Sequence, residues 1–376
     1  MQKQTFEWND ISTVAQLSIF NCADVAEYHA TVKLSNCLLD AQQQFASIET
    51  ALTRIAENYR NITLIFKRYF VSDAVNQAEF LTDSSCAVSF VEQSPVNGTK
   101  VAVWAYFVDN CKIFRDSAGT FVMQRPYYKH LYNMQMTASA SSEARETRIV
   151  FENYVKALAV QNCSLADNCI RTWIFVQGID LHYAGMVEER KLFFAEQGLT
   201  PKTHFIASTG IEGSHIDCKT LVFMDAYAIA GIRPEQISFI NAPENLNPTY
   251  EYGVTFERAT SVDYGDRRHI FVAGTASINN KGEIVHRQDL MKQTDRVFEN
   301  IAALLAQKES EMNDVAQMTV YLRDIADGAR VEQYFKTHGI DIPYLIVHAP
   351  VCRPGWLVEI ECIAIKEVKN SAFENF

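Results

Sequence analysis

The chain has 376 residues, 48% hydrophobic and 21% charged, a balance typical of packed cores that excludes extensive disorder. Its 34 Lys and Arg stand against 45 Asp and Glu, a net charge of −11. Basic residues form no cluster beyond pairs such as Lys67–Arg68, so we expect no nucleic-acid partner. At about 150 residues per domain, this length predicts two or three domains.

Several features of the sequence indicate where in the cell the protein is expected. No apolar stretch approaches the roughly 18 residues that a membrane span needs. The first residues, MQKQTFEWND, have neither a basic head nor an apolar run, so we expect no secretory signal. The nine cysteines include no CxxC pair, and no histidine pair has zinc-finger spacing. We expect a cytoplasmic protein with reduced thiols, no membrane contact, no metal and no cofactor.

Helices and strands alternate along the whole chain. Apolar periodicity in the first third predicts a helix, a strand, a helix and a strand, at 38–57, 62–71, 74–83 and 98–108. The middle third predicts the same order, at 151–161, 170–179, 186–199 and 218–229. The last third predicts a strand and then again this order, at 269–278, 290–307, 316–325, 329–339 and 356–365. One apolar face of the helix at 290–307 carries Val297, Ile301, Leu304 and Leu305.

This recurrence is a sequence repeat. The sequence Phe-Glu-Asn stands in the helices of the last two thirds, at Phe151 and Phe298, and a strand residue follows each by nineteen positions, Ile170 and Gln317. The shared offset favours a true repeat over chance. We expect three α+β units, at 1–110, 111–245 and 246–376, packed around a pseudo-threefold axis. Because the units are fused in one chain, we expect a monomer.

The third unit resembles the YjgF/Rid family through FVAGTASIN (271–279), FENIAALLAQ (298–307), VYLRD (320–324) and VEIECIAIK (358–366). The resemblance implies a fused trimer of Rid-like units around a central barrel, with ligand sites in the clefts between units. Residues 150–365 also resemble the chorismatases, which remove pyruvate from chorismate. The matching strings are RTWIFVQGID (171–180), EERKLFFAEQGL (188–199), ASTGIEG (207–213), NPTYEYGVTFERA (247–259), GTASI (274–278) and CRPGWLVEIE (352–361).

One departure distinguishes the two resemblances. Rid deaminases carry a carboxylate-binding arginine, just after a proline, about fifteen residues before the Glu that corresponds to Glu359. Counting back from Glu359 leads to Tyr344, beside Leu345, and no arginine stands there. The nearest arginine is Arg353, within the string that resembles the chorismatases. This argues against simple imine deamination.

Glu359 is the expected catalytic acid. Release of pyruvate from an enol ether requires a proton donor, and a carboxyl group donates at pH 7 only where burial raises its pKa. Glu359 lies in the otherwise apolar strand WLVEIECIAI and matches the glutamate of the resembling motif. The alternative is a solvated or ion-paired strand residue.

The chorismate dianion also needs cationic groups for two carboxylates. Arg353 stands in the turn before this strand, where Pro354 restricts the backbone, and a guanidinium binds a carboxylate through two hydrogen bonds. Its alternative is a structural pair with an acid such as Glu361. Arg171, in the apolar context CIRTWIFV, is the candidate for the second carboxylate, and Arg258 is a weaker one. We expect Cys352 to line the same site.

Two further segments are candidate parts of the site. Tyr250 and Tyr252 lie in a proline-rich loop, where their hydroxyls would bind the substrate or their rings would pack a linker. Gly210 and Gly213 in STGIEG suggest a tight turn that faces the pocket, or a plain loop.

The first functional hypothesis is a chorismatase-like lyase or hydrolase that gives pyruvate and a hydroxybenzoate or dihydroxycyclohexadiene carboxylate. A Rid-type enamine or imine deaminase is the second hypothesis, and a non-catalytic binder of small carboxylates is the third. Each takes a small carboxylate as its partner, in a cleft between the second and third units.

Overall fold

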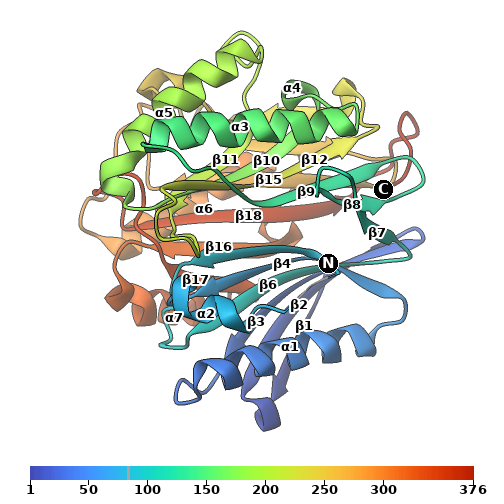
Figure 1. Cartoon of the computed structure of the whole chain (residues 1–376), viewed down its shortest axis with the longest axis vertical. Helices are drawn as coiled ribbons and strands as arrows, with labels where there is room; N and C mark the ends of the chain where they lie inside the picture. Colours follow the sequence, from blue (N-terminus) through green and yellow to red (C-terminus); the bar gives the residue numbers. More distant parts are fainter. Residues whose placement is uncertain (83–84) are drawn as a thin grey trace.

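The computed structural model describes residues 1–82 and 85–376 and contains three six-stranded sheets with helices on their outer sides (Figure 1). In the first unit the elements are β1 (Gln2–Trp8), β2 (Thr13–Cys22), β3 (Val25–Leu34), α1 (Ala41–Asn58), β4 (Ile62–Val71), α2 (Ala74–Gln77), β5 (Ala87–Glu92) and β6 (Val101–Asp109). In the second they are β7 (Lys112–Arg115), β8 (Phe121–Gln124), β9 (Lys129–Thr137), α3 (Glu143–Val160), α4 (Leu165–Asn168), β10 (Cys169–Val176), α5 (Ile179–Glu196), β11 (Ala207–Glu212) and β12 (Val222–Ala230). In the third they are β13 (Ile237–Ile240), β14 (Ala259–Asp263), β15 (Arg267–Ala276), α6 (Leu290–Ala306), β16 (Val315–Leu322), α7 (Gly328–Thr337), β17 (Tyr344–His348) and β18 (Val358–Glu367).

The three sheets have the same topology. Their strand orders are β1-β2-β3-β6-β4-β5, β7-β8-β9-β12-β10-β11 and β13-β14-β15-β18-β16-β17. In each sheet the fourth and fifth strands of the unit pair in parallel, and the other neighbouring strands pair antiparallel. This confirms the predicted repeat, including the first unit, in which the sequence pattern is faintest.

Several element boundaries differ from the sequence prediction. The helix expected from residue 151 begins eight residues earlier, at Glu143, because the Ser142 side chain accepts a hydrogen bond from the Arg145 backbone and caps it. The helix expected at 74–83 is the short α2, followed by a single 3₁₀ turn at Ala78–Phe80, and residue 83 lies outside the described residues. Strand β13 pairs with β14, so the third sheet begins at Ile237, ahead of the unit boundary expected at 245/246.

The units close into a ring through one repeated contact. In each unit the loop before the last strand pairs with the fifth strand of a neighbour, through the bridges Val351 to Ile211, Ser214 to Glu92 and Pro95 to Val347. The third unit therefore contacts the second, the second contacts the first, and the first contacts the third. The result is the expected pseudo-trimer, held by backbone hydrogen bonds at all three junctions.

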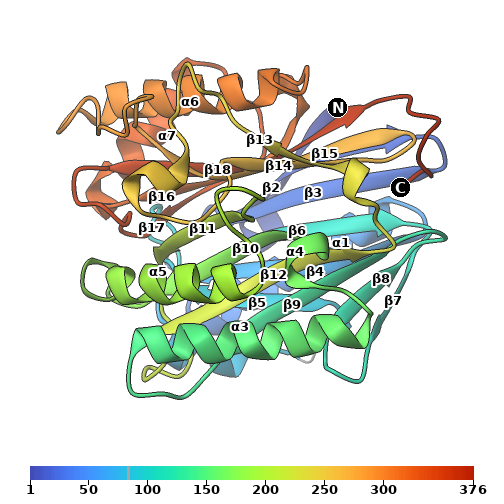
Figure 2. The same cartoon turned by 90° about the horizontal axis from the view of Figure 1, so that it is seen from above.

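The helices cover the outside of the ring, and the sheets face its axis. Figure 2 shows α3 and α5 on one side of the molecule and α6 and α7 on the other, with strands between them. The predicted apolar stripe of α6 is buried, as Val297, Ile301, Leu304 and Leu305 all contribute to the core. Within residues 1–82 and 85–376, no helix has the length and apolarity needed to cross a membrane.

Candidate active site

A cleft between the second and third units contains the predicted acid. It encloses about 510 Å³ of empty space, including its mouth. The second unit supplies side chains from α5 and β11, and the third supplies them from β15, β18 and three loops. Its lining residues are Tyr183, Arg190, Ser208, Thr209, Gly210, Val254, Phe256, Arg258, Gly274, Ala276, Ile278, Cys352, Arg353, Trp356 and Glu359.

Glu359 is the buried acid of this cleft. It lies on β18, paired with Ala276 of β15 and Tyr321 of β16, and its side chain is only 5% exposed. Burial, followed by the negative charge of Glu361, raises its pKa from 4.5 to about 8, although Arg171 and Arg258 act in the opposite direction. At neutral pH the carboxyl group is therefore mostly protonated and can donate.

Gly274 makes room for this carboxyl group. A Cβ atom on Gly274 would overlap Oε1 of Glu359 and would approach the Thr209 methyl group at 3.1 Å. The residue lies at an irregularity in the pairing of β15 with β18, between Val272 and Thr275. A side chain at this position would therefore displace the Glu359 carboxyl group, so the glycine matters here through close approach and not through backbone conformation.

Three arginines share the cleft with the acid. Arg258 is buried and donates to the Asn247 carbonyl at 3.1 Å. Arg353 lies over the Trp356 ring, 5.0 Å from its centroid. Arg190, on α5, is buried with Nη1 3.5 Å from Oγ of Ser208. Three permanent cations beside one neutral acid suit a ligand with more than one carboxylate.

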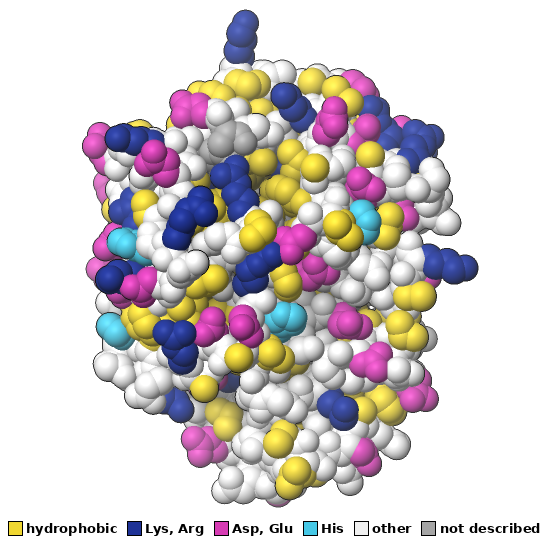
Figure 3. Space-filling model, turned by 90° about the vertical axis from the view of Figure 1, so that its left-hand side faces the viewer, with side chains coloured by type: hydrophobic (Ala, Val, Ile, Leu, Met, Phe, Trp, Pro, Cys, Tyr) yellow, Lys and Arg dark blue, Asp and Glu magenta, His cyan; other side chains and the backbone are white. Residues whose placement is uncertain are grey.

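Figure 3 shows one face of the molecule, on which Lys and Arg side chains are interspersed with Asp and Glu side chains and with apolar side chains. In the cleft itself, Cys352 is a thiol, because burial and the neighbouring Glu359 raise its pKa to about 12. Cys352 therefore adds a weakly polar wall and no further charge.

Arg171 does not line the cleft as expected. Its guanidinium is buried behind the wall, with Nη2 2.7 Å from Oε2 of Glu361 and 2.5 Å from Oγ1 of Thr209. Glu361, the alternative partner that the sequence suggested for Arg353, is thus the partner of Arg171. An arginine in an apolar strand needs a buried counter-charge, and here that counter-charge comes from the neighbouring unit.

The predicted tyrosines and glycines have separate positions. Tyr250 is 47% exposed and lines a different surface pocket, with His204 and Glu257. The side chain of Tyr252 lies outside the described part of the chain. The turn expected at Gly210 and Gly213 is wrong for Gly210, because β11 runs through it in parallel to β10. Its glycine instead admits the Tyr183 ring, 3.2 Å from where a Cβ would be.

The missing Rid-type arginine has a structural explanation. Tyr344 lies on β17 and pairs with Met318 of β16. This part of β17 belongs to the junction with the first unit, where Nζ of Lys33 lies 3.9 Å from the Tyr344 ring centroid. The cleft with Glu359 is instead bordered by β11. On β11, Ser208 holds the position that Tyr344 holds on β17. Arg190 places a guanidinium beside that serine from α5.

Sequence reasoning missed Arg190 and Tyr183. A signal for Arg190 was present, because it continues the buried face of α5 formed by Met186, Val187, Phe193 and Phe194. An arginine on an apolar helix face requires a polar partner or ligand in the interior. Tyr183 is partly exposed on the same helix, and no pattern in the sequence distinguished it.

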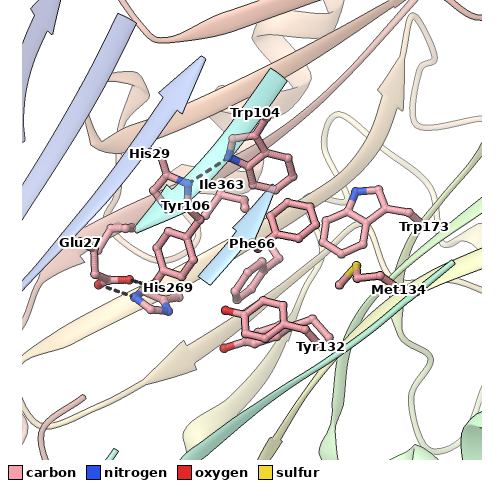
Figure 4. Close-up of a pocket in the computed structure, with 13 residues that line it drawn as sticks. Glu27, His29, Phe66, Trp104, Tyr106, Tyr132, Met134, Trp173, His269 and Ile363 are labelled. Carbon is pink, nitrogen blue, oxygen red and sulfur yellow. Dashed lines mark hydrogen bonds and ion pairs between the residues drawn. The ribbon is translucent and has the colours of Figure 1, made fainter. Parts of the chain in front are cut away.

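A second cavity lies on the central axis of the ring. It encloses about 480 Å³ and is lined largely by aromatic rings from all three units (Figure 4). Its acid, Glu27, accepts hydrogen bonds from Arg267 at 2.7 Å and from Tyr106 at 2.5 Å, and it lies 2.9 Å from Nε2 of His269. This acid is fully engaged, and the pKa of Glu27 is lowered by these partners in spite of burial. In the described residues, no group of three or more His, Cys, Asp or Glu side chains is placed to hold a metal ion.

The fold and the cleft define a fused trimer of like α+β units with a carboxyl group at one junction. Residues 259–366 match the family described as Endoribonuclease L-PSP. A RutC family protein of Pyrococcus abyssi is 40% identical over 101 residues, which are 26% of this chain and 79% of that protein. The chain therefore belongs to the YjgF/Rid superfamily, as the third unit's motifs predicted.

Two other relatives extend this comparison. Protein DfrA of Myxococcus xanthus is 27% identical over 126 residues, 33% of this chain and 89% of that protein. A chorismatase crystal structure superposes with a TM-score of 0.64 at 19% identity, covering 80% of this chain and 93% of that one. The second match shows that the whole three-unit fold is shared. At this identity, it shows the fold alone.

Proposed function

We propose that the protein is a chorismatase-like enzyme that protonates the enolpyruvyl group of chorismate and releases pyruvate. The observation that carries the proposal is the carboxyl group of Glu359, buried in one cleft with Arg190, Arg258 and Arg353, where burial raises its pKa to about 8. Enol ether protonation needs a neutral acid, and a dicarboxylate substrate needs cations. Both requirements are met by residues of this cleft.

The reaction begins with transfer of the Glu359 proton to the enolpyruvyl methylene carbon. The adjacent carbon becomes an oxocarbenium-like centre, which water or a ring hydroxyl attacks. If water attacks, one of its protons returns to the Glu359 carboxylate and a neutral hemiketal forms. The hydroxyl proton of the hemiketal passes to the ring oxygen as the carbon–oxygen bond to the ring breaks, which gives pyruvate and a dihydroxycyclohexadiene carboxylate. A positioned acid of this kind contributes about 10²–10⁴ in rate.

The arginines supply orientation and charge. Arg353, on the loop before β18, and Arg258, which is anchored to Asn247, stand on the third unit, whereas Arg190 stands on the second. A substrate held between them would have its enolpyruvyl group near β18. The pKa of Glu359 stays above its usual range although these arginines are nearby. The arginines can therefore bind carboxylates without ionising Glu359.

A Rid-type imine hydrolase is the second candidate. Arg190 places a guanidinium beside Ser208, the residue of β11 that has the same register in this cleft as Tyr344 has on β17. Ribonuclease activity is not proposed, since a chain with a net charge of −11 and this small cleft does not suit a polynucleotide.

The test is incubation of the purified protein with chorismate, with pyruvate followed through lactate dehydrogenase. We expect turnover by the native protein and at least a 100-fold loss in Glu359→Gln. Arg353→Lys keeps the charge but loses the two-point hydrogen bonding, so KM should rise with less effect on kcat. Absence of pyruvate from the native protein would reject the proposal, and imines generated in situ would then be tested.

A further inference from the structure

A cluster of four buried charges joins all three units behind the wall of the cleft. Arg68 of β4 donates to Asp225 of β12, with Nη2 2.8 Å from Oδ2. Arg171 of β10 pairs with Glu361 of β18 at 2.7 Å. The second guanidinium nitrogen of Arg68, Nη1, lies 4.0 Å from Oε1 of Glu361, which links the two pairs. All four side chains are almost fully buried.

Neutral groups complete this four-charge cluster. Ser89 accepts from Nε of Arg68 at 3.0 Å, and Nε1 of Trp173 donates to Oε1 of Glu361 at 2.8 Å. The Arg68 guanidinium lies 4.5 Å from the Trp173 ring centroid and 5.6 Å from that of Trp104. These rings belong to two units and line the central cavity in Figure 4. The two positive and two negative charges therefore balance in an interior of low dielectric constant.

The cluster adjoins the catalytic acid directly. Glu361 lies two residues beyond Glu359 on β18, so both side chains point to the same face of the strand. Thr209 donates to Glu361 at 2.5 Å and accepts from the Gly274 backbone at 2.9 Å. Gly274 is the glycine that makes room for the Glu359 carboxyl group. The charged and titratable groups near Glu359 on the packed elements are Glu361, Arg171, Arg258, Cys352, Arg353, Arg190, Tyr183 and Tyr321.

We infer that Arg68 and Asp225, supplied by the first and second units, are positioning residues for a cleft that neither of them lines. Because the charges of Arg68 and Asp225 cancel, Arg171 and Glu361 remain as a second neutral pair. The cluster therefore places no surplus positive charge beside Glu359. The first unit thus takes part in the site through one arginine, and does more than close the ring. This inference rests on the proposed acid role of Glu359.

Charge balance predicts opposite effects for the two residues. Arg68→Met leaves the cluster with one surplus negative charge, which should raise the pH at which Glu359 loses its proton. Asp225→Asn leaves one surplus positive charge and should lower that pH. Each shift should be about one pH unit for a charge in the interior. The double variant, Arg68→Met with Asp225→Asn, is neutral again and should return the titration of Glu359 close to its native position.

The primary measurement is infrared difference spectroscopy of the Glu359 carbonyl stretch between pH 5 and 10, with Glu359→Gln subtracted as the blank. Opposite shifts in the single variants and restoration in the double variant support the inference. Equal shifts, or none, overturn it, because loss of packing alone would not change sign with the charge removed. Arg68→Lys is the matched control, since it keeps the charge and should leave the titration in place.

Two additions keep the outcome decisive. If the single variants do not fold, the double variant Arg68→Met with Asp225→Asn, which keeps Arg171 and Glu361 as one cation and one anion, is compared with the native protein, and a large shift overturns the inference. The pH dependence of kcat/KM for pyruvate release should follow the infrared result. If no chorismate turnover exists, the infrared titration still decides the inference, so its failure is separate from failure of the proposed function.

Discussion

Replacing Glu359 with glutamine should make the protein more stable at alkaline pH. The carboxyl group has a pKa of about 8 in the folded protein and 4.5 as its ordinary value. A pKa raised by folding stabilises the folded state fully at pH values below 4.5, and this contribution is lost as pH rises through 8. At about 1.4 kcal/mol for each pH unit between these values, the loss approaches 4 to 5 kcal/mol by pH 9.

Glutamine has nearly the same shape and does not ionise, so the Glu359→Gln variant avoids this loss. We expect similar unfolding temperatures at pH 5 and a variant more stable by about 5 °C at pH 9, measured by the change in tryptophan fluorescence on heating. Glu235→Gln, at an exposed position, is the control and should show no such trend. A difference between variant and native protein that does not change with pH would refute the raised pKa of Glu359.

Two glycine substitutions test the packing argument. Gly274→Ala places a methyl group on the Glu359 carboxyl oxygen and should lower pyruvate release at least 100-fold. Gly210→Ala meets the movable ends of Tyr183, at 3.2 Å, and of Met186, at 3.4 Å, and should lower it less; similar losses in steady-state assays would contradict this. Gly328→Ala brings a Cβ to 2.5 Å from Val96 at the junction of the third and first units. We expect this variant to lower the free energy of unfolding by about 1–3 kcal/mol and to leave KM unchanged. A normal unfolding temperature would argue against that junction.

The order of the later helices and strands of each unit was predictable because it depends on local patterns, whereas the strands that open the first two units, β1 to β3 and β7 to β9, were not predicted. The apolar stripe of α6 and the alternation in β18 come from short-range periodicity, which a sequence displays directly. The recurrence of Phe-Glu-Asn showed the repeat before any fold was known. Short edge strands such as β13 and β17 were not predicted, because their few residues have no periodicity until they pair with a neighbour.

The burial of Glu359 was also indicated by the sequence. A glutamate in an apolar strand is costly unless it is paired or protonated, so the environment of Glu359 was implied by its neighbours. Arg353 and Arg258 were predicted alongside it, and the fold brings all three into one cleft.

The partners of the other arginines were decided only by the tertiary structure. Arg171 stands in an apolar strand and Arg190 on the apolar face of a helix, yet one pairs with Glu361 behind the wall and the other lines the cleft. Which of them meets an acid depends on contacts between residues almost 200 positions apart, across a junction of two units. Local sequence carries no information about such contacts, because they form only when the ring closes.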